Sequence, residues 1–356
     1  MIDIQKECEN RFKKEQEYLG TNKLINQINP LVSVTVTTYQ HAAYIKDCLE
    51  GILMQKTNFP FEIIIGEDES TDGTREICIE YAEKYPDKIR LFLRNRETSQ
   101  LYDENGKFVK RFNGLWTRMS ARGKYIALCE GDDYWTDPLK LQIQVNVLEK
   151  HPQYVFCCHR FKRYIQNEGV FENDFASDWY ENNENYEIDS NILFNIWPTS
   201  TLTMMIRKNA VYNASKNTRN FKHSMDVHFF YYLLKEGKGI SINRIMAVYR
   251  VHEGGISSGL NRDKFITKAY LVHKELHEAN RHEESLRKKY FTYLIRMQTE
   301  TSQSFRKKMR IFKEGLNAYK GRKELLSLML HTIKGILPAF VTKSIINLRH
   351  SKNSIK

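Results

Sequence analysis

The sequence lacks several features that define common protein classes. It contains no run of about 20 apolar residues, the length that a membrane-spanning helix needs. Residues 1–29 are polar and charged and hold no apolar core of the signal-peptide type, so they give no hint of export. The six cysteines form no CxxC pair, and several lie in apolar stretches, where a thiol behaves as a small hydrophobic group. We therefore expect a protein of a reducing compartment, the cytoplasm.

Charge is distributed unevenly along the chain. The formal net charge is +12, but residues 301–356 hold 13 Lys and Arg against two Glu, which leaves the rest of the chain close to neutral. Apolar residues from Leu325 to Ile346 interleave with this basic section, as in segments that lie on the anionic inner face of a membrane. A soluble helical cap with a solvated basic side would show the same pattern. Nucleic acid is not an expected partner, because the aromatic and glycine patterns of RNA-binding modules are absent.

Segments of strand and helix character alternate over most of the chain. The predicted strands are residues 31–38, 59–66, 88–93, 125–129, 154–158, 201–206 and 240–250. Apolar residues at helical spacing follow several of them, at residues 41–55, 70–82 and 139–150. This alternation predicts an α/β fold in which helices flank a mainly parallel sheet. Residues 171–190 have no clear period and are expected to form a substrate-facing loop.

The strand at residues 125–129 is followed by a cluster of carboxylates. Glu130, Asp132 and Asp133 come directly after the apolar run. In open α/β sheets ligands collect outside the carboxyl ends of the strands, and carboxylate oxygens are ligands for divalent metals. The turn also precedes a helix, for which Asp137 is the predicted N-cap and Pro138 the first residue. Because one carboxylate is enough for that turn, we expect the three upstream acids to be functional.

A second acidic turn follows the strand at residues 59–66. It consists of Glu67, Asp68, Glu69 and the segment Ser70-Thr71-Asp72-Gly73-Thr74. Acidic and hydroxyl side chains at a helix start satisfy free backbone N–H groups, which explains residues 70–72. That explanation is insufficient for Asp68.

These motifs occur in a characteristic order. A β-branched strand ends in Thr38-Tyr39, the second acidic turn follows, and a Gly123-Lys124-Tyr125-Ile126 strand leads into the first acidic turn and Pro138. The chain resembles, over residues 31–258, the inverting glycosyltransferases of family 2 with the GT-A fold, of the bacterial cell-surface glycan type. The resemblance implies an N-terminal helix and linker at 1–29, a GT-A domain at 30–260 and a helical basic region at 261–356.

The resemblance also implies a substrate and a cofactor. The donor would be a nucleotide-diphosphate sugar, probed first as a UDP sugar, and a divalent metal, Mg or Mn, would neutralise its diphosphate. Asp132 and Asp133 are the implied metal ligands, and Asp132 is also placed near the ribose. The implied nucleotide contacts are Thr37, Thr38, Tyr39, Glu67 and Asp68. The chain departs from the family at Glu67 and Glu130, where Asp is usual, and at Thr37, where Pro is common.

Inversion at the anomeric carbon needs one general base. By resemblance Asp226 is that base, with the alternative that it only caps the helix that begins there. His252 resembles a position close to the diphosphate. The chain lacks the Gln-x-x-Arg-Trp motif of processive members, so we expect transfer of a single sugar to a cell-surface glycan or a lipid-linked acceptor.

Two other classes remain as alternatives at this point. A nucleotidyltransferase acting on sugar phosphates would also use acidic metal ligands, but it should carry a glycine-rich phosphate loop after its first strand. Residues 37–41 contain no glycine. A non-catalytic carbohydrate-binding protein would need neither the ordered acids nor Asp226.

Overall fold

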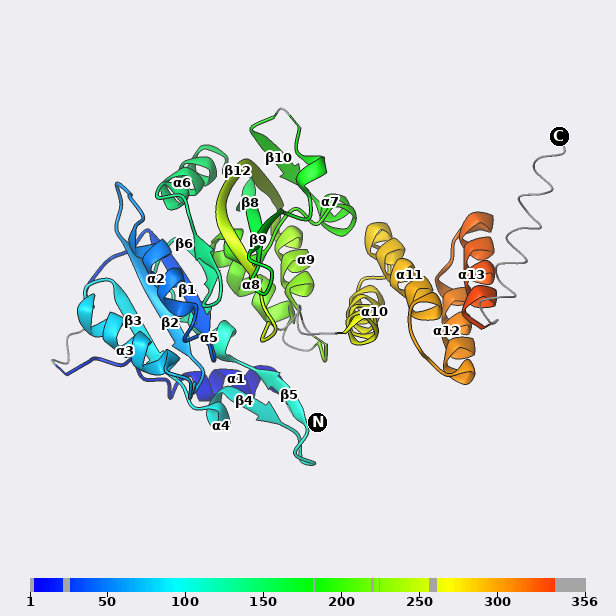
Figure 1. Cartoon of the computed structure of the whole chain (residues 1–356), viewed down its shortest axis with the longest axis horizontal. Coiled ribbons are helices and arrows are strands. Elements are labelled where there is room, and N and C mark those ends of the chain that lie inside the picture. The colour runs from blue at the N-terminus through cyan, green and yellow to red at the C-terminus, as the bar shows by residue number, and fades with distance from the viewer. Residues whose placement is uncertain are drawn as a thin grey trace. The chain divides into compact units, whose positions relative to one another are not determined.

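The computed structural model describes residues 3–21, 26–181, 183–218, 221–223, 225–255 and 261–336. The chain divides into two compact units, Met1–His252 and Glu253–Lys356, each of which is described by itself. The sheet of the first unit and the helices of the second are visible in Figure 1.

A single large sheet organises the first unit. Its strands occur in the order β10-β12-β8-β11-β6-β1-β2-β3, while β7 pairs with β12 and β9 with β8. The bounds are β1 Val32–Thr38, β2 Phe61–Glu67, β3 Ile89–Leu93, β6 Tyr125–Glu130, β7 Tyr134–Trp135, β8 Tyr154–Ile165, β9 Val170–Asn173, β10 Asn185–Ile188, β11 Met205–Arg207 and β12 Lys238–Val251. The pairs among β6, β1, β2 and β3 are parallel, and so is the long pair of β8 with β12. The predicted α/β fold with a mainly parallel sheet is therefore confirmed.

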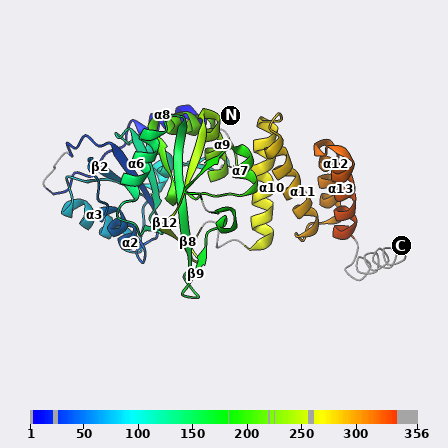
Figure 2. The ribbon, with the colours of Figure 1, turned by 90° about the horizontal axis from the view of Figure 1, so that it is seen from above.

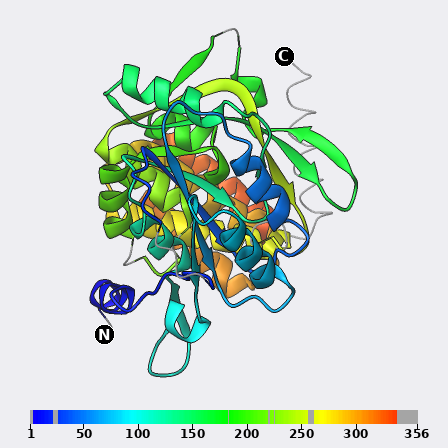
Figure 3. The same cartoon turned by 90° about the vertical axis from the view of Figure 1, so that its left-hand side faces the viewer.

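Helices cover both faces of this sheet (Figure 3). One face packs on α2 (Ile45–Leu53), α3 (Thr74–Lys84) and α6 (Lys140–Lys150), which share one hydrophobic core with alternate residues of β1 and β2. α5 (Asn113–Met119) packs against β1 and β2, and α8 (Lys208–Thr218) and α9 (Asp226–Glu236) against β6, β8, β11 and β12. The remaining helices of this unit are α1 (Ile4–Phe12), α4 (Arg96–Ser99) and α7 (Ser190–Asn195).

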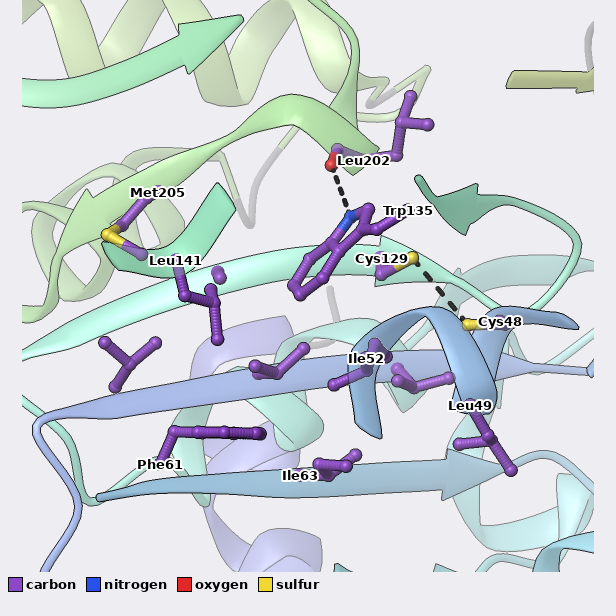
Figure 4. Packing of buried hydrophobic residues seen from close by; sticks show 14 of the residues in the cluster. Cys48, Leu49, Ile52, Phe61, Ile63, Cys129, Trp135, Leu141, Leu202 and Met205 are labelled. Carbon is purple, nitrogen blue, oxygen red and sulfur yellow. Dashed lines mark hydrogen bonds between the residues drawn. The ribbon is translucent and has the colours of Figure 1, made fainter. Parts of the chain in front are cut away.

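The apolar core explains how the acidic turn is held at the sheet. Trp135, directly after that turn, is fully buried, and its indole N–H donates to the Leu202 carbonyl at 3.0 Å. The thiols of Cys48 and Cys129 lie 3.7 Å apart beside it (Figure 4). Burying a residue as large as Trp135 contributes a few kcal/mol to stability. The two residues of β7 thus fix the end of β6 between α2 and β12.

Several local predictions were wrong. Residues 171–190 do not form a loop throughout, because they contain most of β9, the 3-10 turn η1 (Ser177–Trp179) and β10. β9 extends β8 into a hairpin (Figure 2) and β10 pairs with the start of β12. Both are short strands that form because they pair with β8 and β12. Their own sequence pattern does not specify a strand. Residues 201–206 split into the 3-10 turn η2 (Thr201–Thr203) and the start of β11.

The predicted N-cap of α6 is also displaced. The helix begins at Lys140 with Leu139 as its N-cap, and the Asp137 carboxylate instead accepts the Leu139 N–H at 2.9 Å in the preceding turn. The segment between β3 and α5 contains α4 and a two-stranded hairpin of β4 (Gln100–Tyr102) and β5 (Phe108–Arg111).

The second unit consists of helices in the described residues. These are α10 (Arg262–Ala279), α11 (Glu284–Thr299), α12 (Phe305–Ala318) and α13 (Gly321–Ile336), and they share an apolar core that includes Tyr270, Leu294 and Leu328. None of the helices in the described part of the chain combines the length and apolar character needed to cross a bilayer. The basic residues after Ile336 that the sequence assigned to this region lie outside the described residues.

We predict that Gly51→Ala destabilises the first unit. A Cβ at Gly51 in α2 would lie 2.7 Å from the Trp135 carbonyl oxygen and 2.9 Å from its nitrogen, and backbone atoms have little freedom to retreat. Overpacking of this kind costs about 1–3 kcal/mol, which urea denaturation would measure. Gly114→Ala is the matched control, because its Cβ would meet no atom closer than 3.5 Å and alanine favours a helix by up to about 1 kcal/mol. Equal stability of the two variants would contradict the prediction.

Candidate active site

The register of three parallel strands brings the two acidic turns together. Thr38 at the end of β1 lies opposite Glu67 of β2, and Thr37 lies opposite Glu130 of β6. Because parallel strands end at the same edge of a sheet, Asp68 and Asp132, each just past its strand, come to this edge.

Glu67 stabilises the turn after β2. Its side chain is fully buried; one oxygen accepts the Ser70 N–H at 2.7 Å and the other lies 2.8 Å from the Arg75 guanidinium. Glu69, which lies between Glu67 and Ser70, has a φ of 64°. The turn imposes this left-handed conformation on a residue other than glycine. The observed partners of Glu67 are the backbone of the turn and Arg75 at the start of α3.

Asp68 is buried at the edge of the sheet with one oxygen satisfied. Its Oδ1 accepts the Ser99 hydroxyl at 2.7 Å. Its Oδ2 makes no hydrogen bond in the described structure and lies 3.6 Å from Arg111 and 3.9 Å from Arg96. Oδ2 of Asp68 is therefore available to a hydrogen-bond donor.

The predicted nucleotide contacts of β1 lie beside Asp68. The Arg96 guanidinium stacks on the Tyr39 ring, 3.9 Å from its centre, so this half-buried ring has a fixed orientation. The Thr38 carbonyl accepts the Asp68 N–H at 3.1 Å. Thr37 is half-buried at the same edge. The structure therefore brings together the residues that the sequence grouped as a nucleotide site.

Two imidazoles lie beside the carboxylate of Asp132. Its Oδ2 is 3.1 Å from Nε2 of His252 and 3.7 Å from Nε2 of His41. Partial burial opposes ionisation, but the hydrogen bond to His252 and the charge interaction with His41 lower the pKa of Asp132 below its ordinary value. Burial lowers the pKa of His41, although the charge of Asp132 opposes this effect. Asp132 therefore favours the ionised form at neutral pH.

His41 was missed by the sequence analysis. Its Nδ1 lies 3.3 Å from the Thr38 hydroxyl, and a Cβ on Gly131 would lie 3.0 Å from that nitrogen, so this glycine leaves room for the ring. The Tyr44 ring stacks 4.6 Å from that of His252 and helps to fix the pair. Residue His41 follows the Tyr39 motif closely in sequence, but no spacing rule connects it to an acid more than 90 positions later.

Asp133 has a different environment from Asp132. It is 2% exposed, and its Oδ1 accepts the backbone N–H of Arg250 at 2.8 Å. Burial, together with the neighbouring charges of Asp132 and Glu130, raises the pKa of Asp133 well above its ordinary value. Metal binding by Asp133 stays a prediction. The hydrogen-bond partner of Asp133 in the structure is the Arg250 N–H of β12.

Asp226 lies on the other side of the acidic turn, as the first residue of α9 after the N-cap Met225. Glu130 has one buried oxygen with no hydrogen bond in the described structure. Burial and the charge of Asp226 raise the pKa of Glu130 to about 8. The half-buried Arg118 side chain is attracted to both acids, although desolvation lowers its pKa. The predicted base thus shares an electrostatic environment with the acidic turn.

The residues that are present fit a divalent metal only in a limited way. Among the described residues no group of three or more His, Cys, Asp and Glu side chains is arranged to hold a metal ion. Asp132 offers one ionised carboxylate at the edge of the sheet, and a metal that brings phosphate and water ligands needs only one or two protein carboxylates. The donor set therefore suits a metal that arrives with a diphosphate.

Comparison with known proteins identifies the family. The family model described as glycosyl transferase family 2 matches residues 33–217, which is more than half of the chain and contains both acidic turns. The chain belongs to glycosyltransferase family 2. The predicted membership of this family, and with it the GT-A type of sheet, is confirmed.

Relatives within family 2 agree with this assignment. An uncharacterized protein of Mycobacterium tuberculosis is 34% identical over 240 residues, which cover 66% of this chain and 63% of that protein. The chain thus matches less than two thirds of that relative's length. The putative teichuronic acid biosynthesis glycosyltransferase TuaG of Bacillus subtilis is 29% identical over 251 residues, 69% of this chain and 88% of TuaG.

The fold agrees with a solved structure. The crystal structure of S. aureus TarS 1-349 in complex with UDP-GlcNAc has a TM-score of 0.52 and 18% identity, covering 86% of this chain and 79% of TarS. At this identity the likeness shows the family 2 fold alone.

We predict that Glu130→Gln changes the pH dependence of stability. The pKa of Glu130 is near 4.5 when exposed and about 8 in the folded protein. Between these values the folded state retains a proton that the unfolded state has released, so the free energy of unfolding falls as pH rises, by at most about 1.4 kcal/mol per pH unit. Urea denaturation in chelator at about pH 5 and about pH 8 should therefore show that Glu130→Gln gains stability relative to wild type at the higher pH. The exposed Glu172→Gln should keep the wild-type dependence, and an unchanged slope in Glu130→Gln would contradict the prediction.

Proposed function

We propose that the protein is an inverting glycosyltransferase. It moves a single sugar from a nucleotide-diphosphate sugar, with uridine as the first base to test, to a hydroxyl of a cell-surface glycan or lipid-linked acceptor. The observation that carries the proposal is the meeting of Asp68, Asp132 and Asp226 around the carboxyl ends of β1, β2 and β6 in a family 2 fold.

Asp68 supports recognition of the base. Its Oδ2 has no hydrogen bond in the described structure and can accept from a base N–H. The Tyr39 ring, held by Arg96, offers a flat surface for the base, and Thr37 and Thr38 offer hydroxyl groups at the same edge. Glu67 contributes by holding the turn that presents Asp68.

The diphosphate is assigned to the side of Asp132. A bound Mg or Mn ion would neutralise the charge of the leaving diphosphate as a Lewis acid. Asp132 would hold that ion, and Asp133 would do so only on leaving the Arg250 N–H. His252 fixes the Asp132 carboxylate and lies where an N–H donor would meet a phosphate oxygen.

Asp226 is assigned as the base of a single displacement. The acceptor oxygen forms a bond to the anomeric carbon as the bond from that carbon to the phosphate oxygen breaks. The acceptor proton passes to the Asp226 carboxylate, and the electron pair of the broken bond leaves with the nucleoside diphosphate. One carboxylate on the face opposite the leaving group is sufficient for inversion.

We predict that Asp226→Asn removes catalysis without removing donor binding. Loss of a general base lowers kcat by about 100-fold to 10,000-fold. Product formation from a labelled nucleotide sugar would measure the loss, and calorimetry would show an unchanged Kd for the nucleotide. Full activity in Asp226→Asn would remove Asp226 from the mechanism.

We predict the opposite pattern for the comparison variant Asp68→Asn, which should weaken donor binding and keep the catalytic base. Loss of a hydrogen bond to a charged group should weaken nucleotide binding by about 10-fold to 100-fold. Thermal shift with UDP, GDP, ADP and dTDP identifies the base, because a ligand that binds only the folded state raises its stability.

The second unit supports a peripheral position at an anionic membrane. Leu326, Met329 and Ile333 of α13 share one face and are 57%, 43% and 46% exposed. The exposed Arg322 and Lys323 lie one turn before this face. A helix with an apolar face and flanking cations is typical of an interfacial segment.

The acids of this basic section are engaged within the unit. Glu314 pairs with Lys274 at 2.7 Å, and Glu324 pairs with Arg287 at 2.8 Å. Few acids therefore remain to neutralise the exposed cations of α12 and α13, so their charge is available to lipid headgroups.

We predict that the purified protein binds vesicles that contain phosphatidylglycerol and not vesicles of phosphatidylcholine alone. The triple variant Leu326→Gln, Met329→Gln, Ile333→Gln should lose sedimentation with anionic vesicles, and added salt should weaken binding of the wild type. Phe171→Gln, at an exposed apolar residue of β9, is the control and should bind as wild type. Vesicle binding by the triple variant at the wild-type level would exclude this face of α13.

A further inference from the structure

Arg118 is a half-buried cation that is attracted to two acids of the site, Glu130 and Asp226. It is the next-to-last residue of α5, and its Nε is buried without a hydrogen-bond acceptor. Its guanidinium stacks on the Phe229 ring of α9, 4.9 Å from the ring centre, so its position is fixed by packing.

Arg94, which is 2% exposed, shows how acceptors from the protein can satisfy most of the donors of a guanidinium. Arg94 donates to Glu15 at 2.6 Å, to Thr117 at 2.6 Å and to two oxygens of Asn113. A buried guanidinium nitrogen without an acceptor, such as Nε of Arg118, is costly unless a ligand supplies one. Arg118 therefore points to a bound group that the protein alone does not provide.

An acceptor without a donor lies in the same region. Glu130 has a buried Oε2 with no hydrogen bond in the described part of the chain. Arg118 is attracted electrostatically to Glu130 and to Asp226, but it forms no ion pair within 4.0 Å of either. A ligand that fits between these groups must accept hydrogen bonds from Arg118 and donate to a carboxyl group.

This requirement selects hydroxyl groups over phosphate. A hydroxyl both donates and accepts, so it can meet Arg118 and a carboxyl group in either protonation state, whereas a phosphate only accepts and would be repelled by the ionised Asp132. Given the proposed function, the diphosphate lies at Asp132 and the attacking hydroxyl at Asp226. The transferred sugar joins these two points. Arg118 is attracted to Asp226 at one of them and to Glu130, two positions before Asp132, near the other.

We propose that Arg118 binds hydroxyl groups of the transferred sugar and contributes to selection of the donor. This inference rests on the proposed function, and it assigns to Arg118 a sugar contact and not a phosphate contact.

The test compares binding of a nucleotide with binding of its sugar conjugate. The base is first identified by thermal shift, and Kd is then measured by calorimetry for the free diphosphate and for its glucose, galactose and N-acetylglucosamine conjugates. Arg118→Met should weaken binding of the preferred nucleotide sugar by about 10-fold and leave the Kd of the free diphosphate unchanged. Arg118→Lys retains a charged donor and should recover part of the difference.

Two controls separate this role from a structural one. Lys124→Met removes a surface cation that pairs with Glu149 and should leave both Kd values unchanged. The Tm of Arg118→Met should equal or exceed that of the wild type, because the variant removes a buried charge and keeps the contact with Phe229. A lower Tm together with equal losses for diphosphate and conjugate would overturn the proposal in favour of a structural or phosphate-binding role.

Other outcomes are also decisive. Unchanged binding of every conjugate in Arg118→Met would overturn the sugar contact while leaving the proposed function intact. Absence of binding by UDP, GDP, ADP and dTDP to the wild type would overturn the proposed function and the Arg118 inference together.

Discussion

The hydrogen bond from the Arg250 backbone to Asp133 is the contact on which the arrangement of the site depends. It joins the acidic turn after β6 to the end of β12, 117 positions later in sequence. The Arg250 side chain reinforces the link, because its Nε donates to the Asp132 carbonyl at 3.0 Å. With these two elements held together, His252 reaches the Asp132 carboxylate. Loss of one partner of such a buried bond leaves a polar group unsatisfied, which costs about 1–3 kcal/mol.

Environment gives neighbouring acids different properties. Asp132 is only partly buried and meets imidazole nitrogens, so its pKa is lowered despite the burial. Asp133 and Glu130 are buried beside other acids, and burial is the largest cause of the raised pKa of each. One ionised carboxylate therefore faces the edge of the sheet while its neighbours favour the protonated state. This separation limits mutual repulsion before any cation is bound, since like charges in a small volume disfavour ionisation.

The sequence was sufficient for the fold wherever a segment carries its own pattern. The apolar runs of β1, β2 and β6, and the acids that follow them, predicted the parallel core and the edge at which the turns meet. Elements specified by partners were missed: β9 and β10 are strands because β8 and β12 pair with them. His41 is likewise defined by a tertiary contact, with Asp132, and no local spacing announces it.

The sheet also determines where Arg118 lies, through a glycine at the end of β2. A Cβ on Gly66 would collide with the Arg94 guanidinium and with the hydroxyl of Thr117. The absence of a side chain at Gly66 therefore lets Arg94 pass under the strand and bind Asn113 and Thr117, which fixes the first turn of α5. Arg118 follows Thr117 directly, so the contacts of Arg94 with Asn113 and Thr117 also set the orientation of Arg118. The same strand then continues into Glu67 and Asp68. Gly66 thus connects the predicted nucleotide contacts of the site to α5, the helix that carries Arg118.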